Sequence, residues 1–400
     1  MKLSSIFEHE NSSGLSWKLF LYSCRTYCRL WRTSFFPPRP YSRPGLKRKA
    51  MLAVLLPLLG AVQLGHWMAL ALDCVLFPDF KDTRVNRPFF IVGIPRSGTT
   101  HLHRVLSRDE NRFTTLKLWH VLLAPAICQR RMVNLLAGLD RLAGRPLARL
   151  LQKSAAFLSR GLDDVHDIAL DQPEEDFLLL LPAMSCFILI PVFPQSREIS
   201  DLAFFDLKFS PEHRREVMNF YKAMLKRHLY CEGPDKTLLS KNVSFTPMLS
   251  SLLQTFPKAR IAACVRDPEK TLPSQISAME KSWVLLGNST EYELFVKRWV
   301  ELISHYYKIL ADSCSCSSSR EMQCIDMSSL TRDLKGTVQA LYQQFNMEPD
   351  QDFLQALADE ESRARKFTSR HKYSLTGYGL HAEDLRPVKL LWEQIRAFSL

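Results

Sequence analysis

A strand that runs into a glycine-bounded loop constrains the fold of this chain more than any other feature. Residues 88–100 read PFFIVGIPRSGTT, in which an apolar run reaches Gly93 and a second glycine follows at Gly98. Four residues separate the two glycines, which is the spacing of phosphate-binding loops that join a β-strand to an α-helix. The first amides of such a helix have no intrahelical acceptor and attract anions. The stretch predicts an α/β fold, a parallel sheet flanked by helices, with an anion site at the start of a helix.

The cation of this loop stands in an unusual place. A nucleotide-binding loop of this spacing ends in Gly-Lys followed by Ser or Thr, whereas Thr99 occupies the lysine position here. Arg96 lies inside the loop instead, and its guanidinium can bind two oxygens of one oxyanion. Gly98 lets the backbone approach a ligand, and Ser97 and Thr100 add hydroxyl donors beside that of Thr99.

Two later segments also end on a basic residue. Residues 236–240 read as a short buried strand followed by Lys241, and residues 259–265 read as another strand followed by Arg266. Ligands of open α/β sheets gather outside the carboxyl ends of the strands. We therefore predict that Arg96, Lys241 and Arg266 share one anionic ligand.

The N-terminal part of the chain divides into a basic segment and an apolar segment. Residues 1–50 hold ten Lys and Arg against two Glu, so +8 of the net charge of +12 lies there. Residues 50–72 contain no charged side chain, and a membrane span needs ~20 such residues. The alternative is a buried or interfacial helix, because Pro57, Gln63 and His66 interrupt the apolar run.

Charge also predicts how the chain is placed in the cell. Lys47, Arg48 and Lys49 precede the apolar run, so the positive-inside rule predicts a cytosolic head at 1–49, a transmembrane anchor at 50–77 and a body on the luminal side. This is a single-pass type II topology in the membrane of the Golgi or the ER. The body carries only +4, which gives no basic face of the size that nucleic acid requires.

Four separated motifs resemble the sulfotransferases that use 3′-phosphoadenosine 5′-phosphosulfate (PAPS). They are the loop at 94–100, the tripeptide Ser240-Lys241-Asn242, the segment from Phe256 to Pro268 with Ser274 after it, and residues 371–380. Their order and spacing agree as well, over about Arg87 to His381. The chain looks most like the broad subfamily that includes the tyrosylprotein sulfotransferases and many membrane-anchored relatives. The resemblance implies a sulfotransferase domain at 85–400, with a helical insertion at about 116–210 after the first helix.

The resemblance implies roles for individual residues. Arg96 through Thr100 would bind the 5′-phosphosulfate, Arg266 and Ser274 would hold the 3′-phosphate, and Lys241 would stabilise negative charge on the oxygen between sulfur and phosphorus. The sulfuryl group would pass to a hydroxyl or amine of a glycan, lipid or protein acceptor. No metal is expected, because a sulfuryl group carries less charge than a phosphoryl group and cationic side chains can suffice.

The general base is an open question in the sequence. His120 occupies the position at which relatives offer a glutamate, and a histidine with a pKa near ~6.5 accepts protons at neutral pH. The alternative interpretation makes His120 a structural histidine. Glu174 and Glu175 are then the other candidate bases, unless they form a solvated acidic face.

Two other functions fit parts of the pattern. A P-loop nucleotide kinase would share the strand and loop, but it should keep the lysine that Thr99 replaces and should need magnesium. A non-catalytic membrane protein with the sulfotransferase fold is favoured by His120 in place of Glu and by Val243 in place of the proline that relatives carry. The sequence predicts neither the identity of the acceptor nor the oligomeric state.

Overall fold

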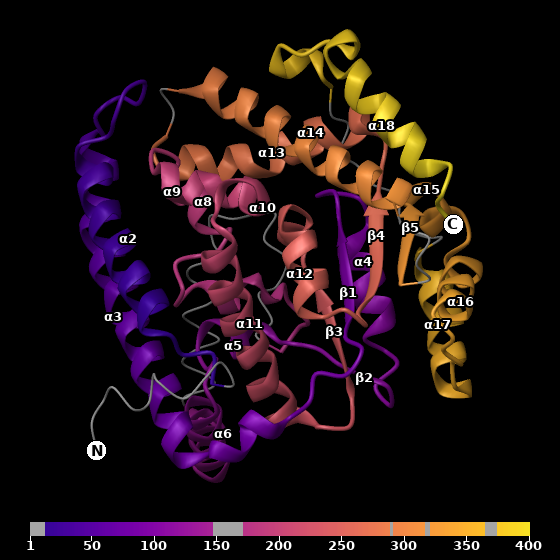
Figure 1. Ribbon diagram of the computed structural model, residues 1–400, viewed down its shortest axis with the longest axis horizontal. Helices are drawn as coiled ribbons and strands as arrows, with labels where there is room; N and C mark the ends of the chain where they lie inside the picture. The colour runs from indigo at the N-terminus through magenta and orange to yellow at the C-terminus, as the bar shows by residue number, and fades with distance from the viewer. Residues whose placement is uncertain (1–12, 147–170, 289–290, 317–320, 365–373) are drawn as a thin grey trace.

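A parallel β-sheet occupies the centre of the molecule (Figure 1). The computed structural model describes residues 13–146, 171–288, 291–316, 321–364 and 374–400. Five strands lie in the order β2-β3-β1-β4-β5, and all neighbours are parallel. Their bounds are β1 Phe89–Gly93, β2 Phe113–Thr114, β3 Thr237–Lys241, β4 Arg260–Val265 and β5 Met322–Asp326. The predicted α/β fold with a parallel sheet is confirmed.

The central strands are buried on both faces. Every residue of β1 and β4 is buried, and their alternate side chains enter two separate hydrophobic clusters. Phe90 and Val92 join one cluster, while Phe89 and Ile91 join the other. Strands covered on both faces read as continuous apolar runs, which is why the sequence shows them clearly.

Strand register brings the predicted cations to one edge of the sheet. Ile91 of β1 pairs with Lys241 at the end of β3, and Gly93 pairs with Cys264, two residues before Arg266. The loop after β1 leaves the sheet at the same edge. This arrangement agrees with the prediction that these three strands end beside one another.

Helices cover both faces of the sheet. One face is covered by α4 Thr99–Leu106, α15 Met327–Arg332, α16 Leu334–Gln344 and α17 Gln351–Ala364. The other is covered by α11 Pro211–Glu232, α12 Leu249–Thr255, α13 Pro268–Leu285, α14 Tyr292–Cys316 and α18 Arg386–Arg396. Short 3-10 helices join these elements at η1 Pro78–Asp82, η4 Val243–Met248, η5 Thr376–Tyr378 and η6 Ala382–Leu385. The predicted motif at 371–380 lies partly outside the described residues, which resume at residue 374.

The segment between β2 and β3 is helical in its described part. Before the long helix α11 it contains α5 Leu118–Leu122, α6 Ile127–Leu142, η2 Asp176–Leu180, α8 Leu189–Val192, α9 Arg197–Ser200, η3 Asp201–Phe204 and α10 Phe205–Lys208. Residues 147–170 of the predicted insertion lie outside the described residues. The boundaries at about 116 and 210 stay a prediction.

Two helices precede the sheet and lie side by side along one flank of the molecule, α2 Trp17–Phe35 and α3 Leu46–Leu76 (Figure 1). Within the described part of the chain, α3 is the one helix long and apolar enough to cross a membrane, judged by length and composition. The same test is passed by core helices of soluble proteins, so it is weak evidence for an anchor.

The C-terminal end of α3 is joined to the body by a buried carboxylate. Asp73 accepts from Nε of Arg227 on α11 at 3.1 Å, in an ion pair that is almost fully shielded from solvent. The same carboxylate accepts from the backbone amides of Ile127 and Cys128 at 2.8 and 2.9 Å. Asp73 therefore supplies the acceptors that the first amides of α6 need, and it fixes α3 to two other helices.

The basic head also contacts the body. Lys18 and Arg29 of α2 form ion pairs with Glu212 and Glu198 at 2.5 and 2.6 Å, and Nη1 of Arg48 donates to the carbonyl of Leu286 at 2.5 Å. Residues 1–12 of the head lie outside the described residues. The type II topology stays a prediction, and it would require these contacts to break because it separates head from body by a bilayer.

Candidate functional site

The loop after β1 has room for glycine alone at its first position. Gly93 has a φ of 135°, and a Cβ there would lie 2.1 Å from the carbonyl oxygen of Cys264 on β4. Gly98 has a φ of 87° and forms the N-cap of α4 without a side-chain cap. The first amides of α4 are consequently left open to an external acceptor at a point where the backbone is bare.

The hydroxyl groups of the loop divide into structural and open ones. Ser97 is fully buried, and its Oγ donates toward the carbonyls of Ile94 and Cys264 at 2.5 and 3.0 Å. This hydroxyl shapes the loop. Thr99 is also buried, whereas Thr100 is exposed at the rim of the site.

Arg96, Arg266 and Ser274 lie together at one side of the loop. Nε of Arg96 donates to Oγ of Ser274 on α13 at 3.2 Å, and Nη1 of Arg266 donates to the backbone carbonyl of Arg96 at 3.1 Å. The Tyr307 hydroxyl donates to the carbonyl of Arg266, which fixes the backbone after β4. Within the described residues Arg96 contacts no carboxylate. Three donors that sequence motifs predicted are thus adjacent in space.

A cavity of about 310 Å³ adjoins Arg266. It lies beyond the carboxyl ends of β4 and β5, and Lys270, Asp326, Trp392 and Arg396 help to line it. The indole Nε1 of Trp392 donates to Asp326 at 3.1 Å, and the Arg396 guanidinium lies 5.4 Å from the centre of the indole ring. The cavity offers an aromatic surface and basic groups next to the two arginines.

Lys241 occupies the other side of the loop. Its side chain is buried, and Nζ donates to Oε1 of Glu175 at 2.6 Å and to Oγ1 of Thr100 at 3.3 Å. Glu175 is partly open to solvent. An ammonium group, a carboxylate and a loop hydroxyl therefore meet at the carboxyl end of β3, beside the start of α4.

Glu175 reaches this place through a short antiparallel pairing. Lys117 forms an isolated β-bridge with Pro173, and the amide of Glu174 donates to the carbonyl of Leu116 at 2.9 Å. Oε1 of Glu174 accepts from the amide of Glu175, also at 2.9 Å. The carboxylate of Glu174 is used locally, whereas that of Glu175 points to Lys241.

The buried carboxyl of Asp176 lies next to Glu175 in the sequence and binds the residue that follows Lys241. Asp176 accepts from the Tyr221 hydroxyl at 2.6 Å and from Nδ2 of Asn242 at 3.3 Å. Burial raises the pKa of Asp176 to about 6, although the hydrogen bonds from Tyr221, Ser240 and Asn242 act in the opposite direction. The sequence interpretation missed this role, and the only signal for it was the position of Asp176 directly after the two glutamates.

The histidines that follow the loop form no metal pair. His103 is buried, its Nε2 lies 2.7 Å from Oγ1 of Thr115, and burial together with the charge of Lys241 lowers its pKa to about 3. His101 has a different position on α4, partly exposed, and its pKa is also lowered by burial. No group of three His, Cys, Asp or Glu side chains that could hold a metal ion occurs among the residues that the structure describes.

His120 lies in a separate polar cluster. Its Nδ1 accepts from the amide of Lys117 at 3.2 Å, and its Nε2 lies 3.5 Å from Oε1 of Glu232, at the end of α11. Arg130 and His228 complete the cluster, with Nη1 of Arg130 3.1 Å from Nδ1 of His228. Burial and the charges of Arg130 and Lys117 lower the pKa of His120 to about 2. Within the described chain, His120 contacts none of the predicted donor-binding residues.

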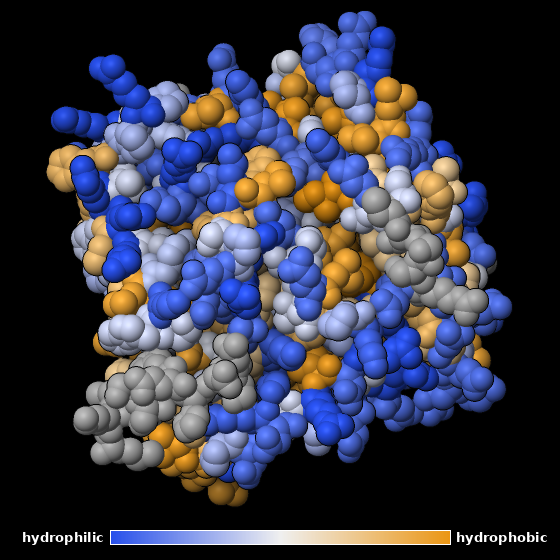
Figure 2. Space-filling view, in the orientation of Figure 1, coloured by the Kyte–Doolittle hydropathy of each residue, from blue (hydrophilic) through white to orange (hydrophobic). Residues whose placement is uncertain are grey.

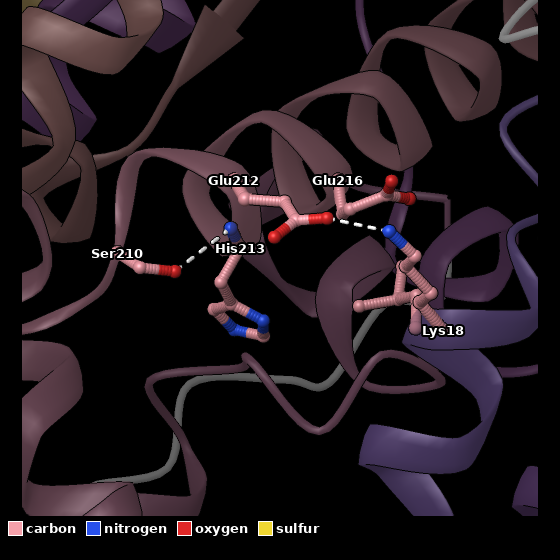
Figure 3. Close-up of a pocket in the computed structure, with 6 residues that line it drawn as sticks. Lys18, Ser210, Glu212, His213 and Glu216 are labelled. Atoms are coloured by element: carbon pink, nitrogen blue, oxygen red, sulfur yellow. Dashed lines mark hydrogen bonds and ion pairs between the residues drawn. The ribbon is translucent and has the colours of Figure 1, made fainter.

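A second cavity, of about 250 Å³, lies away from all of these residues (Figure 3). It is formed between α2 and the start of α11, where Lys18 pairs with Glu212 and the amide of His213 donates to Ser210. Glu216 also lines it. It contains none of the predicted site residues.

Comparison with known proteins identifies the fold and the family. The family model described as "Sulfotransferase family" matches residues 88–352. The sulfotransferase Stf3 from Mycobacterium bovis, named for ω-hydroxy-β-dihydromenaquinone-9, is 23% identical over 77% of this chain and 74% of its own length. The crystal structure of sulfotransferase STF9 from Mycobacterium avium matches with a TM-score of 0.69 and 16% identity, over 96% of both chains.

A second solved structure matches over nearly the whole chain, including α2 and α3. Sulfotransferase STF1 from Mycobacterium tuberculosis gives a TM-score of 0.66 and 17% identity, over 99% of both chains. At these identities the structures establish the fold alone. The family model covers more than half of the chain and contains the glycine-bounded loop, Lys241, Arg266 and Ser274. The chain therefore belongs to the sulfotransferase family.

Proposed function

We propose that this protein transfers the sulfuryl group of PAPS to a hydroxyl group of a membrane lipid. The observation that carries the proposal is the convergence on one loop of two sets of groups. Arg96, Arg266 and Ser274 lie at one side, and Lys241 with Glu175 lies at the other. The first set suits a nucleotide with two separated anionic groups, and the second suits the transfer of a sulfuryl group from that nucleotide to an acceptor.

The donor would occupy the loop with its phosphosulfate at the start of α4. The open amides of α4 and the guanidinium of Arg96 would bind the 5′-phosphosulfate, since helix N-termini and planar guanidinium groups both favour oxyanions. Arg266 and Ser274 would bind the 3′-phosphate. The cavity beside Arg266 offers space and the indole of Trp392 for the nucleoside.

Lys241 and Glu175 would have different roles in the transfer. The acceptor oxygen attacks the sulfur atom, the bond between sulfur and the bridging oxygen breaks, and the electron pair remains on the 5′-phosphate of the departing nucleotide. Lys241 would stabilise the negative charge that develops on that oxygen. Glu175 would take the proton of the acceptor hydroxyl, because its carboxylate is partly open to solvent and lies 2.6 Å from Nζ of Lys241.

We assign the base to Glu175 in preference to the other candidates. His120 has its Nδ1 occupied by the amide of Lys117, and a pKa of about 2 makes its imidazole a weak proton acceptor. Glu174 accepts from the following amide and contacts neither Lys241 nor Thr100 among the described residues. His120 is then a structural residue, the second of the two interpretations that the sequence left open.

The acceptor class rests on the relative Stf3. That protein is named for a hydroxylated menaquinone, a lipid alcohol, and it aligns over three quarters of this chain. A lipid acceptor also fits an enzyme that carries a long apolar helix, and we propose that α3 attaches the protein to a membrane. The Golgi or ER location, the luminal orientation and the likeness to the tyrosylprotein sulfotransferase subfamily stay predictions of the sequence.

A transfer assay in EDTA tests the proposal against both alternatives. We expect radiolabelled sulfate to pass from PAPS to the alcohol of a hydroxylated isoprenoid quinone in detergent, without any added divalent metal. A kinase would instead transfer phosphate from ATP and would stop in EDTA. A non-catalytic protein would bind 3′-phosphoadenosine 5′-phosphate (PAP) and sulfate nothing in a panel of lipid, glycan and peptide acceptors.

The donor site has its own test. Arg266→Ala should weaken PAP binding by roughly 30-fold to several thousand-fold, the range expected when one partner of a buried charge pair is lost. Lys258→Ala, which removes an exposed lysine just before the other end of β4, is the matched control and should change the dissociation constant by a few-fold at most. An unchanged dissociation constant in Arg266→Ala would refute the assignment of the 3′-phosphate.

A further inference from the structure

Helix α3 has an inverted distribution of polarity. From Ala50 to Leu76, every side chain that the structure exposes is apolar. These residues are Ala50, Ala53, Val54, Pro57, Leu58, Ala61, Leu64, Met68, Leu72, Val75 and Leu76. The polar residues Gln63, His66 and Asp73 are buried on the opposite face. A surface helix of a soluble protein normally shows the reverse.

The exposed apolar residues form one continuous stripe. From one helical turn to the next they lie three or four positions apart, which keeps them on a single face of an α-helix. The stripe extends along 27 residues, or ~40 Å of helix at 1.5 Å per residue. A contiguous exposed apolar surface of this length marks a contact with a partner or a membrane.

A second group of exposed apolar side chains adjoins the C-terminal end of the stripe. Asp73 of α3 caps the N-terminus of α6, so the two helices meet there. Beyond this point α6 exposes Met132, Leu135, Leu136, Leu139 and Leu142. Figure 2 shows hydrophobic side chains at the lower edge of the molecule, where Figure 1 places α6.

The buried face of α3 excludes a spanning position for the helix as it is docked. Nε2 of Gln63 donates to the carbonyl of Leu181 at 2.5 Å, and Nε1 of Trp67 donates to that of Pro182 at 2.9 Å. Arg48 and Asp73 bind the body at the two ends of the helix. If α3 crossed a bilayer in this position, the helices packed on it would have to enter the hydrocarbon as well.

The charge around the stripe is complementary to anionic lipid. Residues 13–72 contain nine Lys and Arg and no Asp or Glu. Arg43, Lys47 and Lys49 are exposed at the start of α3, and α2 beside it exposes Arg25 and Arg32. Each basic side chain near an anionic leaflet contributes ~1 kcal/mol to binding.

We propose that the protein lies on the membrane surface, with the outer stripe of α3 and the exposed leucines of α6 immersed in one leaflet that contains anionic lipid. In this position α3 lies in the plane of the interface. Its apolar side chains enter the boundary between headgroups and acyl chains, to a depth of ~5–10 Å. The head and the body stay on the same side of the membrane, because Lys18 and Arg29 of the head form ion pairs with Glu212 and Glu198 of the body.

Vesicle flotation tests the stripe directly and needs no enzyme activity. The full chain should float with vesicles of phosphatidylcholine and phosphatidylglycerol (7:3) and bind more weakly to phosphatidylcholine alone. Leu64→Glu/Met68→Glu changes two stripe residues that are 56% and 59% exposed, and it should lower the partition coefficient at least tenfold. Leu64→Ser/Met68→Ser is the milder version, with PAP affinity as the measure of correct folding in both.

Matched controls come from exposed leucines on other faces. Leu207→Glu on α10 and Leu390→Glu on α18 alter side chains that are 70% and 62% exposed, and both should bind vesicles like the unaltered chain. Wild-type protein that ignores both kinds of vesicle, or stripe variants that bind as well as the controls, would overturn the proposal. So would a stable dimer in solution that loses its self-association in the stripe variants while showing no affinity for vesicles.

Labelling from one side of the membrane separates surface attachment from a membrane span. Single cysteines are introduced at the exposed positions Arg39, before α3, and Lys258, in the body, of a chain whose ten native cysteines are replaced by serine or alanine. The protein is then reconstituted in sealed membranes. An impermeant maleimide should label Arg39→Cys and Lys258→Cys from the same side. Labelling from opposite sides would establish the single-pass topology and overturn the proposal.

Discussion

Lys241 and His120 are both basic groups buried beside a carboxylate, but their surroundings differ. Nζ of Lys241 lies 2.6 Å from Glu175 and also contacts Thr100, the exposed hydroxyl of the anion loop. Nε2 of His120 lies 3.5 Å from Glu232, in a cluster that Arg130 and His228 complete. We call the first group the open cluster (Lys241, Glu175, Thr100) and the second the sealed cluster (His120, Arg130, His228, Glu232).

The difference supports the proposal that the open cluster is the reaction site. The open cluster lies at the carboxyl end of β3, where the register of the sheet brings it to the loop after β1. The sealed cluster joins α5, α6 and α11, and it contacts Thr114 at the end of β2, which β3 separates from β1 and its loop. Burial alone lowers the pKa of a histidine, but an anion site beside the group is what makes it useful for sulfuryl transfer.

Removal of the Lys241 ammonium group should lower the rate of transfer strongly. Lys241→Ala is expected to lower kcat by roughly 10²- to 10³-fold, the usual cost of losing one group that stabilises charge in the transition state. PAP affinity should change by a few-fold at most, which calorimetric titration measures. Lys236→Ala, at the other end of the same strand and exposed, is the control and should retain full turnover. Equal losses of turnover in the two variants would contradict the role of Lys241 in the reaction.

The buried carboxyl of Asp176 should make the free energy of unfolding depend on pH. The pKa of Asp176 is raised from 3.8 to about 6, so the folded chain holds this proton when the unfolded chain has released it. Its contribution is fully present below pH 3.8 and is lost as the pH rises through 6, a fall of up to about 3 kcal/mol in the free energy of unfolding.

Asp176→Asn removes this titration. The free energy of unfolding of both proteins is measured by urea denaturation between pH 4 and 7. As the pH rises, the wild type should lose stability relative to the variant. The buried histidines titrate in both proteins and cancel in the comparison. Parallel curves would show that Asp176 is ionised throughout this range.

The sealed cluster should matter for stability. Arg130 donates to the carbonyl of Ala124 and contacts His228, so Arg130→Met should lower the free energy of unfolding by about 2 kcal/mol while the folded enzyme keeps its turnover within about threefold. Arg131→Met changes the exposed neighbour, which stacks on Phe77, and should cost less than about 1 kcal/mol. A large loss of turnover in Arg130→Met without a change in stability would move the sealed cluster into the reaction.

The sequence predicted the strands and the loop that carry the proposed donor site. β1, β3 and β4 were located within one residue because strands buried on both faces are continuous apolar runs. Arg96, Arg266 and Ser274 follow from motifs that are local in sequence, and the structure brings them together. β2 and β5 were not predicted, since two residues of β2 and a strand with two half-buried positions give little pattern.

The acceptor side depended on contacts that sequence patterns do not carry. Glu175 reaches Lys241 only because residues near Leu116 pair with residues near Glu174, across an insertion of more than fifty residues. His120 occupied the expected sequence position, but the contacts of α5 turn it toward α11. The docking of α3 was hidden for the same reason, because its partners Leu181, Pro182 and Arg227 lie more than a hundred residues further along the chain.

Single-turnover transfer by Glu175→Gln and His120→Gln tests the central claim most directly. Both variants are saturated with PAPS and mixed with excess acceptor, and the rate of PAP formation is followed. If the open cluster is the reaction site, Glu175→Gln should lower the rate of PAP formation by roughly 10²- to 10⁴-fold, the range of general-base catalysis. His120→Gln should keep a rate within about threefold of wild type. A wild-type rate in Glu175→Gln together with a large loss in His120→Gln would contradict the account.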